Sequence, residues 1–523
     1  MTLTGRSLVG SSPGTAEGSL FHAVNPATGE EIDPPFTTAT MEDVERAAQL
    51  ADDAFGVYAF VGGREKGEFL RRIAEKLEAS GEALVQRAHL ETALPGPRLQ
   101  SELGRTTGQL RLFAALVEEG SWPRPRIDRG DAARKPVPKP DVRSMRRPLG
   151  PVAVFGASNF PLAFSVPGGD TVSALASGCP VIVKAHPSHP GTAELAAAAI
   201  AEAVRESSLP EGVFSLLFDS GHEIGAALVQ HPLVRAVAFT GSRRGGLALM
   251  ELAGRRREPI PLFAEMGSIN PVFILPGALR SRGAEIAAGL DASVTMGVGQ
   301  FCTNPGLLLV QRGDPASGML ERLTTLLEAR APETMLNATI CEAYHSGVAR
   351  FSKTEGVKTD VSVAGARETS AGAALFTTDA RTFLSNEHLM DEVFGPASLV
   401  VEWSSRDDLF ELVRSLEGQL TVTLHATEDD LEEYADLVRL LETKGGRILF
   451  NGYPTGVEVC HAMVHGGPFP ATSDGRSTSV GTLAIERFTR LVAYQNAPDS
   501  VLPLELKDAN PLGIRRMIDG KVV

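Results

Sequence analysis

Cysteine is scarce in this sequence, and its scarcity argues against one class of fold. Only four cysteines occur in 523 residues, and they are Cys179, Cys302, Cys341 and Cys460. Small secreted scaffolds need many more cysteines per residue to build a disulfide framework. We therefore expect reduced thiols and a cytoplasmic location.

Positive charge and long apolar runs are lacking as well. Lys and Arg number 50 against 64 Asp and Glu, which gives a formal charge of −14, so general binding of nucleic acid or anionic membranes is not expected. The apolar stretch at residues 151–167 is interrupted by glycine, asparagine and proline, and it is too broken to cross a bilayer. Residues 1–20 contain no apolar segment typical of a secretory signal.

The chain is long enough to form two or three domains. Hydrophobic residues make up 43% and charged residues 22%, which is ordinary for a soluble globular protein. The first part is predicted to be helical. Thr40 is predicted to cap a helix that starts near Met41 and has an apolar face at residues 44–55, and further helical patterns cover residues 65–78 and 99–118. The Pro-rich, basic segment at residues 121–141 indicates a surface linker or an extended arm.

From residue 148 onward, short apolar runs alternate with segments of helical length. These runs lie at residues 152–155, 181–183, 213–217, 236–239, 260–263, 307–311, 399–402, 420–425 and 447–451. Helices are expected between them, including residues 284–297 and 319–331. Such alternation predicts parallel α/β sheets, here in two successive domains.

Three short motifs could carry chemistry. Cys302 follows an expected helix in a glycine-rich turn, where backbone N–H groups can favour a thiolate. Glu265 ends an apolar strand, where a carboxylate can act as a general base. The sequence Thr-Gly-Ser at residues 240–242 precedes a helix whose N-terminus could attract phosphate. Taken singly, each motif also fits a plain structural role, as a core thiol, a solvated carboxylate or a helix cap.

The order of these motifs along the chain resembles that of a known protein family. Seven segments follow one another: 25–30 (NPATGE), 156–162 (GASNFPL), 183–184 (VK), 239–242 (FTGS), 265–267 (EMG), 299–302 (GQFC) and 392–396 (EVFGP). In this order they resemble the aldehyde dehydrogenase superfamily along nearly the whole chain. Residues 91–95, 99–114, 155–160 and 459–467 look most like the branch that contains 2-oxoglutarate semialdehyde and bacterial long-chain fatty aldehyde dehydrogenases.

The resemblance implies roles for individual residues. Cys302 would attack the aldehyde, the Asn159 amide and the Cys302 backbone N–H would hold the oxyanion, and Glu265 would activate the hydrolytic water. The residues implied in holding NAD or NADP are Lys184, His186, Ser188, Gly241, Ser242, Glu392 and Phe394.

Two departures from the family pattern bear on cofactor and catalysis. Pro187 stands where most NAD-preferring members have a glutamate, so the repulsion of a 2′-phosphate is absent and we predict that NADP is preferred. A loop that tolerates both cofactors is the alternative. His465 stands where many members have a phenylalanine; it could tune the thiol, bind substrate or simply pack, and His461 is its rival.

The substrate is predicted from the helix that lines the tunnel in this superfamily. Arg105 on that helix could bind the carboxylate of a short semialdehyde, although a solvent-facing arginine fits the sequence too. We favour 2-oxoglutarate semialdehyde. The runner-up is a medium- or long-chain fatty aldehyde in an apolar channel around Phe160 and Phe164.

Rival activities are an acylating dehydrogenase that uses coenzyme A and a catalytically silent homologue. Glu265 argues against the first, and the joint presence of Cys302, Asn159 and Glu265 argues against the second. No residues with metal-ligand spacing are found in the sequence, so no metal is expected.

The expected fold class is α/β and aldehyde dehydrogenase-like. Residues 1–121 and 148–261 would form a Rossmann-like dinucleotide-binding domain, and residues 262–484 a catalytic domain. Residues 122–147 and 485–523 would form a small oligomerisation arm. The resemblance implies a homodimer or homotetramer.

Overall fold

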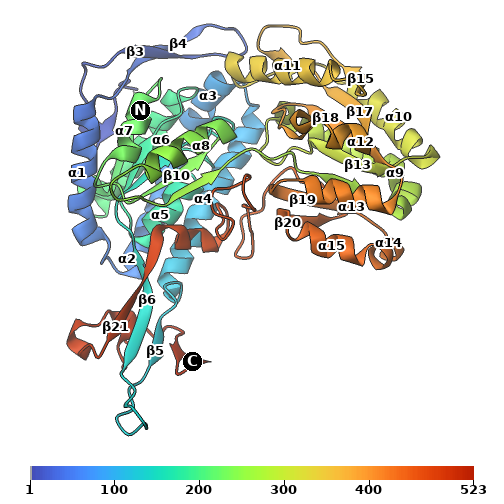
Figure 1. Ribbon diagram of the computed structural model, residues 1–523. Coiled ribbons are helices and arrows are strands. Elements are labelled where there is room, and N and C mark those ends of the chain that lie inside the picture. Colours follow the sequence, from blue (N-terminus) through green and yellow to red (C-terminus); the bar gives the residue numbers. More distant parts are fainter. Residues whose placement is uncertain (1–2) are drawn as a thin grey trace.

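The computed structural model describes residues 3–523 and has two lobes, each built on a seven-stranded sheet flanked by helices (Figure 1). A third, five-stranded sheet projects from the first lobe. The predicted α/β class with parallel sheets is confirmed. Along the described chain, no helix combines the length and the apolar character that a bilayer crossing requires.

The first sheet has a parallel centre with an antiparallel edge. Its order is β11 (Leu262–Glu265), β10 (Ala236–Thr240), β7 (Val152–Phe155), β8 (Val181–Lys184), β9 (Phe214–Leu217), β1 (Leu8–Val9) and β2 (Ser12–Pro13). The apolar runs that predict β7 to β10 are buried on both faces, as expected for parallel strands covered by helices.

One predicted boundary is corrected by this sheet. The expected catalytic domain begins at residue 262, but β11 pairs with β10 from Leu262 to Glu265. The strand therefore belongs to the first sheet, and the second lobe begins after it. The apolar pattern alone could not assign the strand, because it fits an edge position in either sheet.

Helices cover both faces of the first sheet. They are α1 (Met41–Tyr58), α2 (Gly63–Ala79), α3 (Gly81–Thr92), α4 (Gly96–Glu119), α5 (Gly169–Ser177), α6 (Pro190–Glu206), α7 (Glu223–Gln230) and α8 (Arg243–Gly254). The predicted cap is confirmed at α1, where Thr40 and Asp43 form a reciprocal capping box. Helix α4 packs along α2 with Phe113 and Leu110 fully buried, which fixes the position of Arg105 on the same helix.

The second sheet is parallel except for its edge strand β15. Its order is β15 (Lys358–Ser362), β17 (Ala374–Asp379), β18 (Ala397–Trp403), β13 (Leu307–Gln311), β12 (Val272–Ile274), β19 (Gln419–His425) and β20 (Gly445–Phe450). The larger helices around it are α9 (Pro276–Thr295), α10 (Asp314–Glu328), α11 (Ala338–Ser352), α13 (Arg406–Ser415) and α15 (Ala435–Leu441). Residues 451–481 then return to lie between the two lobes (Figure 1), where Thr472 bridges Glu265 of the first sheet.

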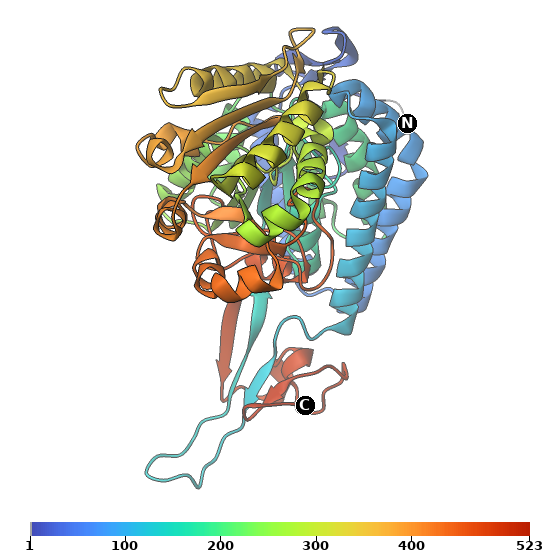
Figure 2. The same cartoon turned by 90° about the vertical axis from the view of Figure 1, so that its right-hand side faces the viewer.

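The projecting sheet combines two distant parts of the chain (Figure 2). Its order is β21 (Thr489–Gln495), β6 (Val142–Pro148), β5 (Arg126–Asp128), β22 (Met517–Ile518) and β23 (Lys521–Val522). The two segments predicted to form the arm thus come together. The arm begins at β21 rather than at residue 485, because Ile485 and Phe488 pack into the core of the first lobe.

Candidate active site

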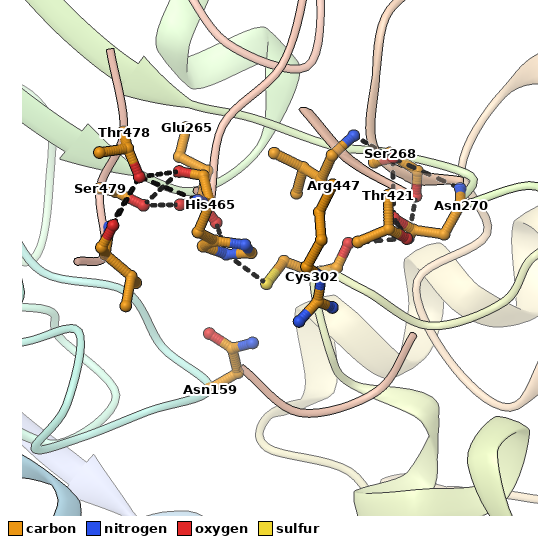
Figure 3. Close-up of polar contacts among 12 residues, drawn as sticks. Asn159, Glu265, Ser268, Asn270, Cys302, Thr421, Arg447, His465, Thr478 and Ser479 are labelled. Atoms are coloured by element: carbon orange, nitrogen blue, oxygen red, sulfur yellow. Dashed lines mark hydrogen bonds and ion pairs between the residues drawn. The ribbon is translucent and has the colours of Figure 1, made fainter. Parts of the chain in front are cut away.

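The residues predicted to carry the chemistry converge between the two lobes (Figure 3). Glu265 ends β11, Cys302 follows the short helix η2 (Met296–Gly299), and His465 lies in the segment that returns after β20. Each of the three side chains comes from a different element. Only the packing of the lobes brings them together.

The turn before Cys302 is built from left-handed backbone. Gly297, Val298 and Gly299 have φ values of 55°, 58° and 64°. A Cβ on Gly299 would lie 2.3 Å from the carbonyl carbon of Gly395, so only glycine fits there. Val298 is a β-branched residue in a region that such residues rarely adopt, at a cost of about 1–3 kcal/mol. The turn is held in this strained form by its neighbours and fixes the direction of the Cys302 backbone.

Asn270 holds that backbone from the other side. Its Nδ2 donates to the carbonyl oxygens of Cys302 at 2.8 Å and Asn304 at 2.9 Å. Its Oδ1 accepts hydrogen bonds from the Ser268 and Thr421 hydroxyls. This residue was not predicted from the sequence, since an asparagine shortly after a strand end carries no distinctive spacing.

The thiol, imidazole and carboxylate form one contact chain. The Nε2 atom of His465 lies 3.4 Å from Cys302 Sγ and 2.9 Å from Glu265 Oε1. The Ser479 hydroxyl donates to the other carboxylate oxygen of Glu265. His465 and Glu265 are almost completely buried. His461, the rival, is exposed, so the structure places His465 and not His461 beside the thiol.

Burial and charge set the protonation of this group. Burial, reinforced by the nearby Glu265 carboxylate, raises the pKa of the Cys302 thiol well above its usual value. Burial alone would raise the pKa of Glu265, but His465 and the Ser479 hydroxyl outweigh it and lower that pKa. The unliganded site therefore holds a protonated thiol and an ionised carboxylate, with the imidazole between them.

Asn159 is oriented toward the thiol from the loop that follows β7. Its side chain extends toward Cys302 (Figure 3), and its Nδ2 donates to the Gln300 carbonyl at 3.0 Å. Arg98 donates to the Asn159 carbonyl at 2.8 Å and holds its backbone. An amide nitrogen has two hydrogens, so the second one is free to donate to an oxyanion.

Arg105 is a partly buried cation among aromatic rings. Its guanidinium lies 5.0 Å from the centroid of Phe164 and 6.0 Å from that of Phe160, and Phe164 lies 6.0 Å from the His465 ring. Its Nε and Nη2 are buried and have no hydrogen-bond partner among residues 3–523. Burial lowers its pKa, partly offset by Glu102. The solvent-facing alternative is therefore wrong.

A second guanidinium was not predicted from the sequence. Arg447 lies on β20, and Figure 3 shows it beside Cys302. Its side chain donates to the carbonyl oxygens of Gly456 at 3.0 Å and Pro454 at 2.7 Å. As the first residue of a predicted strand it carried no functional signal, because the approach of β20 to the thiol depends on the second sheet.

The proposed cofactor residues lie at the carboxyl edge of the first sheet. Lys184 ends β8 half-buried, and within the described chain it has no ion-pair partner; burial lowers its pKa, opposed by Asp219. Ser242 caps α8 by accepting from the Gly245 N–H at 3.2 Å, and both Gly241 and Ser242 are exposed. An ammonium with no ion-pair partner in the described chain and an accessible helix N-terminus at the same edge of the sheet fit the ribose and phosphates of a dinucleotide.

The remaining cofactor residues lie in two other places. His186 and Ser188 occupy the loop after β8; burial keeps the pKa of His186 well below its usual value, and Ser188 accepts from Asn337 Nδ2 at 3.0 Å. Glu392 and Phe394 line a cavity together with Phe301, and Glu392 Oε1 accepts from the Ser268 N–H at 3.4 Å. Glu392 also lies near enough to Cys302 for its charge to contribute to the raised pKa of the thiol.

Comparison with known proteins gives one consistent result. A family model described as "Aldehyde dehydrogenase family" matches residues 14–491. Alpha-ketoglutaric semialdehyde dehydrogenase 2 of Azospirillum brasilense is 51% identical over 525 residues and covers 100% of both chains. Alpha-ketoglutaric semialdehyde dehydrogenase of Acinetobacter baylyi is 46% identical and covers 99% of this chain and 98% of its own.

Solved structures agree on the fold. Gamma-glutamyl-gamma-aminobutyraldehyde dehydrogenase from Burkholderia cenocepacia superposes with a TM-score of 0.81 at 21% identity, covering 95% of this chain and 97% of its own. Betaine aldehyde dehydrogenase from Staphylococcus aureus, solved with NAD+, has a TM-score of 0.79 at 20% identity and covers 95% of each chain.

Proposed function

The chain belongs to the aldehyde dehydrogenase family, and on that premise we propose that it oxidises 2-oxoglutarate semialdehyde to 2-oxoglutarate. It is an NAD(P)-dependent aldehyde oxidoreductase. The two relatives described above act, by their names, on this semialdehyde, and they match this chain over its whole length.

The observation that carries the substrate proposal is the partly buried guanidinium of Arg105, whose Nε and Nη2 are buried without a hydrogen-bond partner among the described residues. A desolvated cation is costly unless an anion pairs with it. Two nitrogen donors of this guanidinium have no hydrogen-bond partner in the described chain. Phe164 lies beside the guanidinium and also beside His465, which neighbours the thiol. A bound carboxylate at the far end of a short semialdehyde would satisfy these donors while the aldehyde faces Cys302. A long alkyl chain would leave them unsatisfied.

The residues of the site divide the chemistry between them. Cys302 attacks the aldehyde carbon, and His465, 3.4 Å from its sulfur, receives the thiol proton. The Asn159 amide and the Cys302 N–H hold the oxyanion, each worth on the order of 3 kcal/mol of barrier. NAD(P), when held by Lys184, Ser242 and Glu392, would supply the hydride acceptor at this step. Glu265 then takes a proton from the water that hydrolyses the thioester on Cys302.

NADP is the proposed preference between the two cofactors. The position three residues after Lys184 is Pro187, so no carboxylate there repels a 2′-phosphate. Lys184 makes no ion pair in the part of the chain that the structure describes, although Asp219 lies near enough to raise its pKa, and its ammonium is available for the adenosine ribose and its phosphate. A loop that accepts both cofactors equally is the alternative outcome.

The substrate proposal is tested by steady-state kinetics with Arg105→Leu. We expect the KM for 2-oxoglutarate semialdehyde to rise on the order of 100-fold, because a buried charge pair is lost, while the KM for hexanal changes little. Arg111→Leu is the matched control, since Arg111 lies on the same helix but is exposed and paired with Glu78 at 2.6 Å. Each enzyme is assayed with NAD and with NADP.

The wild-type profile decides between the candidate substrates. A preference for hexanal and dodecanal over the semialdehyde, with equal losses for both in Arg105→Leu, would overturn the carboxylate site and favour a fatty aldehyde substrate. Activity that requires added coenzyme A would indicate acyl transfer instead of hydrolysis.

A further inference from the structure

The thiol, imidazole and carboxylate of the active site form a constellation with ligand geometry for a metal. One donor atom from each of Cys302, His465 and Glu265 lies within 4.8 Å of the other two. No spacing in the sequence indicates it, because His465 follows Cys302 by 163 residues. The sequence-based expectation of no metal rests on local spacing, whereas this cluster is assembled only by the fold.

The separations match a tetrahedral zinc ion. Zinc binds sulfur at about 2.3 Å and imidazole nitrogen or carboxylate oxygen at about 2.0–2.1 Å, so a tetrahedron has an S–N edge of about 3.5 Å and an N–O edge of about 3.3 Å. The observed distances are 3.4 Å between Cys302 Sγ and His465 Nε2, and 2.9 Å between Nε2 and Glu265 Oε1. The third separation, between Cys302 Sγ and the Glu265 carboxylate, is within 4.8 Å, and side-chain rotation can adjust it to the zinc geometry.

The residues around the three donor atoms also suit a zinc site. The Ser479 hydroxyl binds the free oxygen of Glu265 and orients the carboxylate, which is the kind of outer support that metal ligands receive. Thiolate, imidazole and carboxylate are all zinc ligands, and the thiolate makes hard cations such as magnesium unfavourable. One thiolate and one carboxylate together neutralise the charge of the zinc ion. Without this neutralisation, the nearby cationic Arg105 would repel the ion.

We propose that Cys302, His465 and Glu265 bind one zinc ion, which reversibly blocks the nucleophile. Zinc replaces the proton of the thiol, the proton passes to water, and a sulfur–zinc bond forms without electron transfer. Water takes the fourth position. The blocking effect rests on the proposed role of Cys302, whereas the binding site itself rests on geometry alone.

Binding is measured on the complete protein with cobalt(II) as a spectroscopic probe and zinc as its competitor. We expect one equivalent of cobalt to produce a sulfur-to-cobalt charge-transfer band in the near ultraviolet and visible bands typical of tetrahedral coordination. Added zinc should abolish both, and EDTA should remove the metal. This readout does not depend on catalysis, so it remains informative even if the proposed substrate is wrong.

Variants assign the ligands. Cys302→Ser should abolish the charge-transfer band, and His465→Phe should weaken zinc binding on the order of 100-fold or more, while Ser479→Ala weakens it on the order of tenfold. Cys460→Ser is the control, because Cys460 is the other partly exposed thiol and lies beside His461. Loss of the band in Cys460→Ser, or its persistence in Cys302→Ser, would overturn the site.

Inhibition is tested separately. Zinc should compete with aldehyde, raising its apparent KM without changing the limiting rate, and should protect Cys302 from alkylation by iodoacetamide as detected by mass spectrometry. Alkylation of Cys302 at an unchanged rate under saturating zinc would contradict the proposal.

Discussion

In the proposed mechanism, Asn159 supplies a single side-chain hydrogen bond to the developing oxyanion. Asn159→Ala should lower kcat on the order of 100- to 1,000-fold, the range typical for loss of one such donor, and should leave cofactor affinity unchanged. Stopped-flow or steady-state kinetics together with cofactor titration measure both quantities. Asn386→Ala, which removes an amide that donates to the Thr382 carbonyl, is the control. A kcat within about threefold of wild type would reject the role.

His425 makes the folded protein sensitive to acid. It ends β19, is 1% exposed, and neither of its ring nitrogens has a partner in the described residues. Burial, with a smaller contribution from Arg282, lowers its pKa from 6.5 to about 4. The unfolded chain therefore binds a proton more readily than the folded one between these values. Stability is fully present above pH 6.5 and falls as the pH drops toward 4.

His425→Leu should reduce this acid sensitivity. At about pH 5 the buried histidine lowers the free energy of unfolding by about 2 kcal/mol relative to neutral pH. This value follows from the two pKa values and about 1.36 kcal/mol per pKa unit. Urea unfolding at both pH values measures the difference between wild type and variant. His22→Leu, on the edge hairpin strand β3 (Leu20–Val24), is the control. If the free energy of unfolding of His425→Leu falls between the two pH values by as much as that of the wild type, the His425 ring is not the source of the acid sensitivity.

At the scale of secondary-structure elements, the left-handed turn of η2 determines where the Cys302 thiol lies. Gly299→Ala places a Cβ 2.3 Å from Gly395 at a φ of +64°, so the turn must shift. A displacement of about 1 Å at a reacting group can cost on the order of 100-fold in rate, and we expect kcat to fall by at least that factor.

The control for this substitution is Gly318→Ala. Gly318 is exposed on α10, and a Cβ at this position would meet no atom of the described residues within 4 Å. The change should therefore stabilise the helix by up to about 1 kcal/mol and leave kcat unchanged. Circular dichroism and thermal unfolding check that both variants fold. Wild-type kcat in a folded Gly299→Ala enzyme would reject the steric argument.

The positions of strands and helices were predicted most accurately where burial gives the apolar residues a regular spacing along the chain. Strands β7 and β13 match the predicted ranges residue for residue, and α1 begins after its Thr40 cap. The short pairs β1–β2 and β3–β4 (β4 spans Glu31–Thr37) were not predicted, because β3 and β4 alternate weakly and β1 and β2 have two residues each. Their pairing depends on contacts with distant segments.

At the scale of the whole molecule, the projecting sheet exposes apolar side chains along an unpaired edge. Strand β21 pairs with β6 on one side, and its Leu491 is 68% exposed. An open, apolar edge strand favours pairing with another strand. We therefore expect the predicted homodimer or homotetramer to use this edge.

Leu491→Arg should disrupt that association. A buried charge at a strand-to-strand contact is unfavourable, so light scattering after gel filtration should show a lower mass than wild type at equal concentration. Leu20→Arg is the control, since Leu20 is 65% exposed on β3, in a different sheet. An unchanged mass for Leu491→Arg would exclude β21 from the interface.

The sequence by itself determined the family and the α/β alternation, and it singled out Cys302, Glu265 and Asn159 as candidate catalytic residues. These follow from local order: a motif keeps its residues adjacent, and a strand or helix shows its period within a few residues. The same local reasoning left Arg105 and His465 undecided, since burial depends on what packs against them.

The tertiary structure decided which of these side chains meet. Cys302, His465 and Glu265 come from three elements, and their contact is created by the segment that returns between the lobes. The supporting roles of Asn270, Ser479 and Arg447 emerged in the same way. Distances between residues far apart in the chain are set by the packing of whole sheets and helices, and that packing is not encoded in any local pattern.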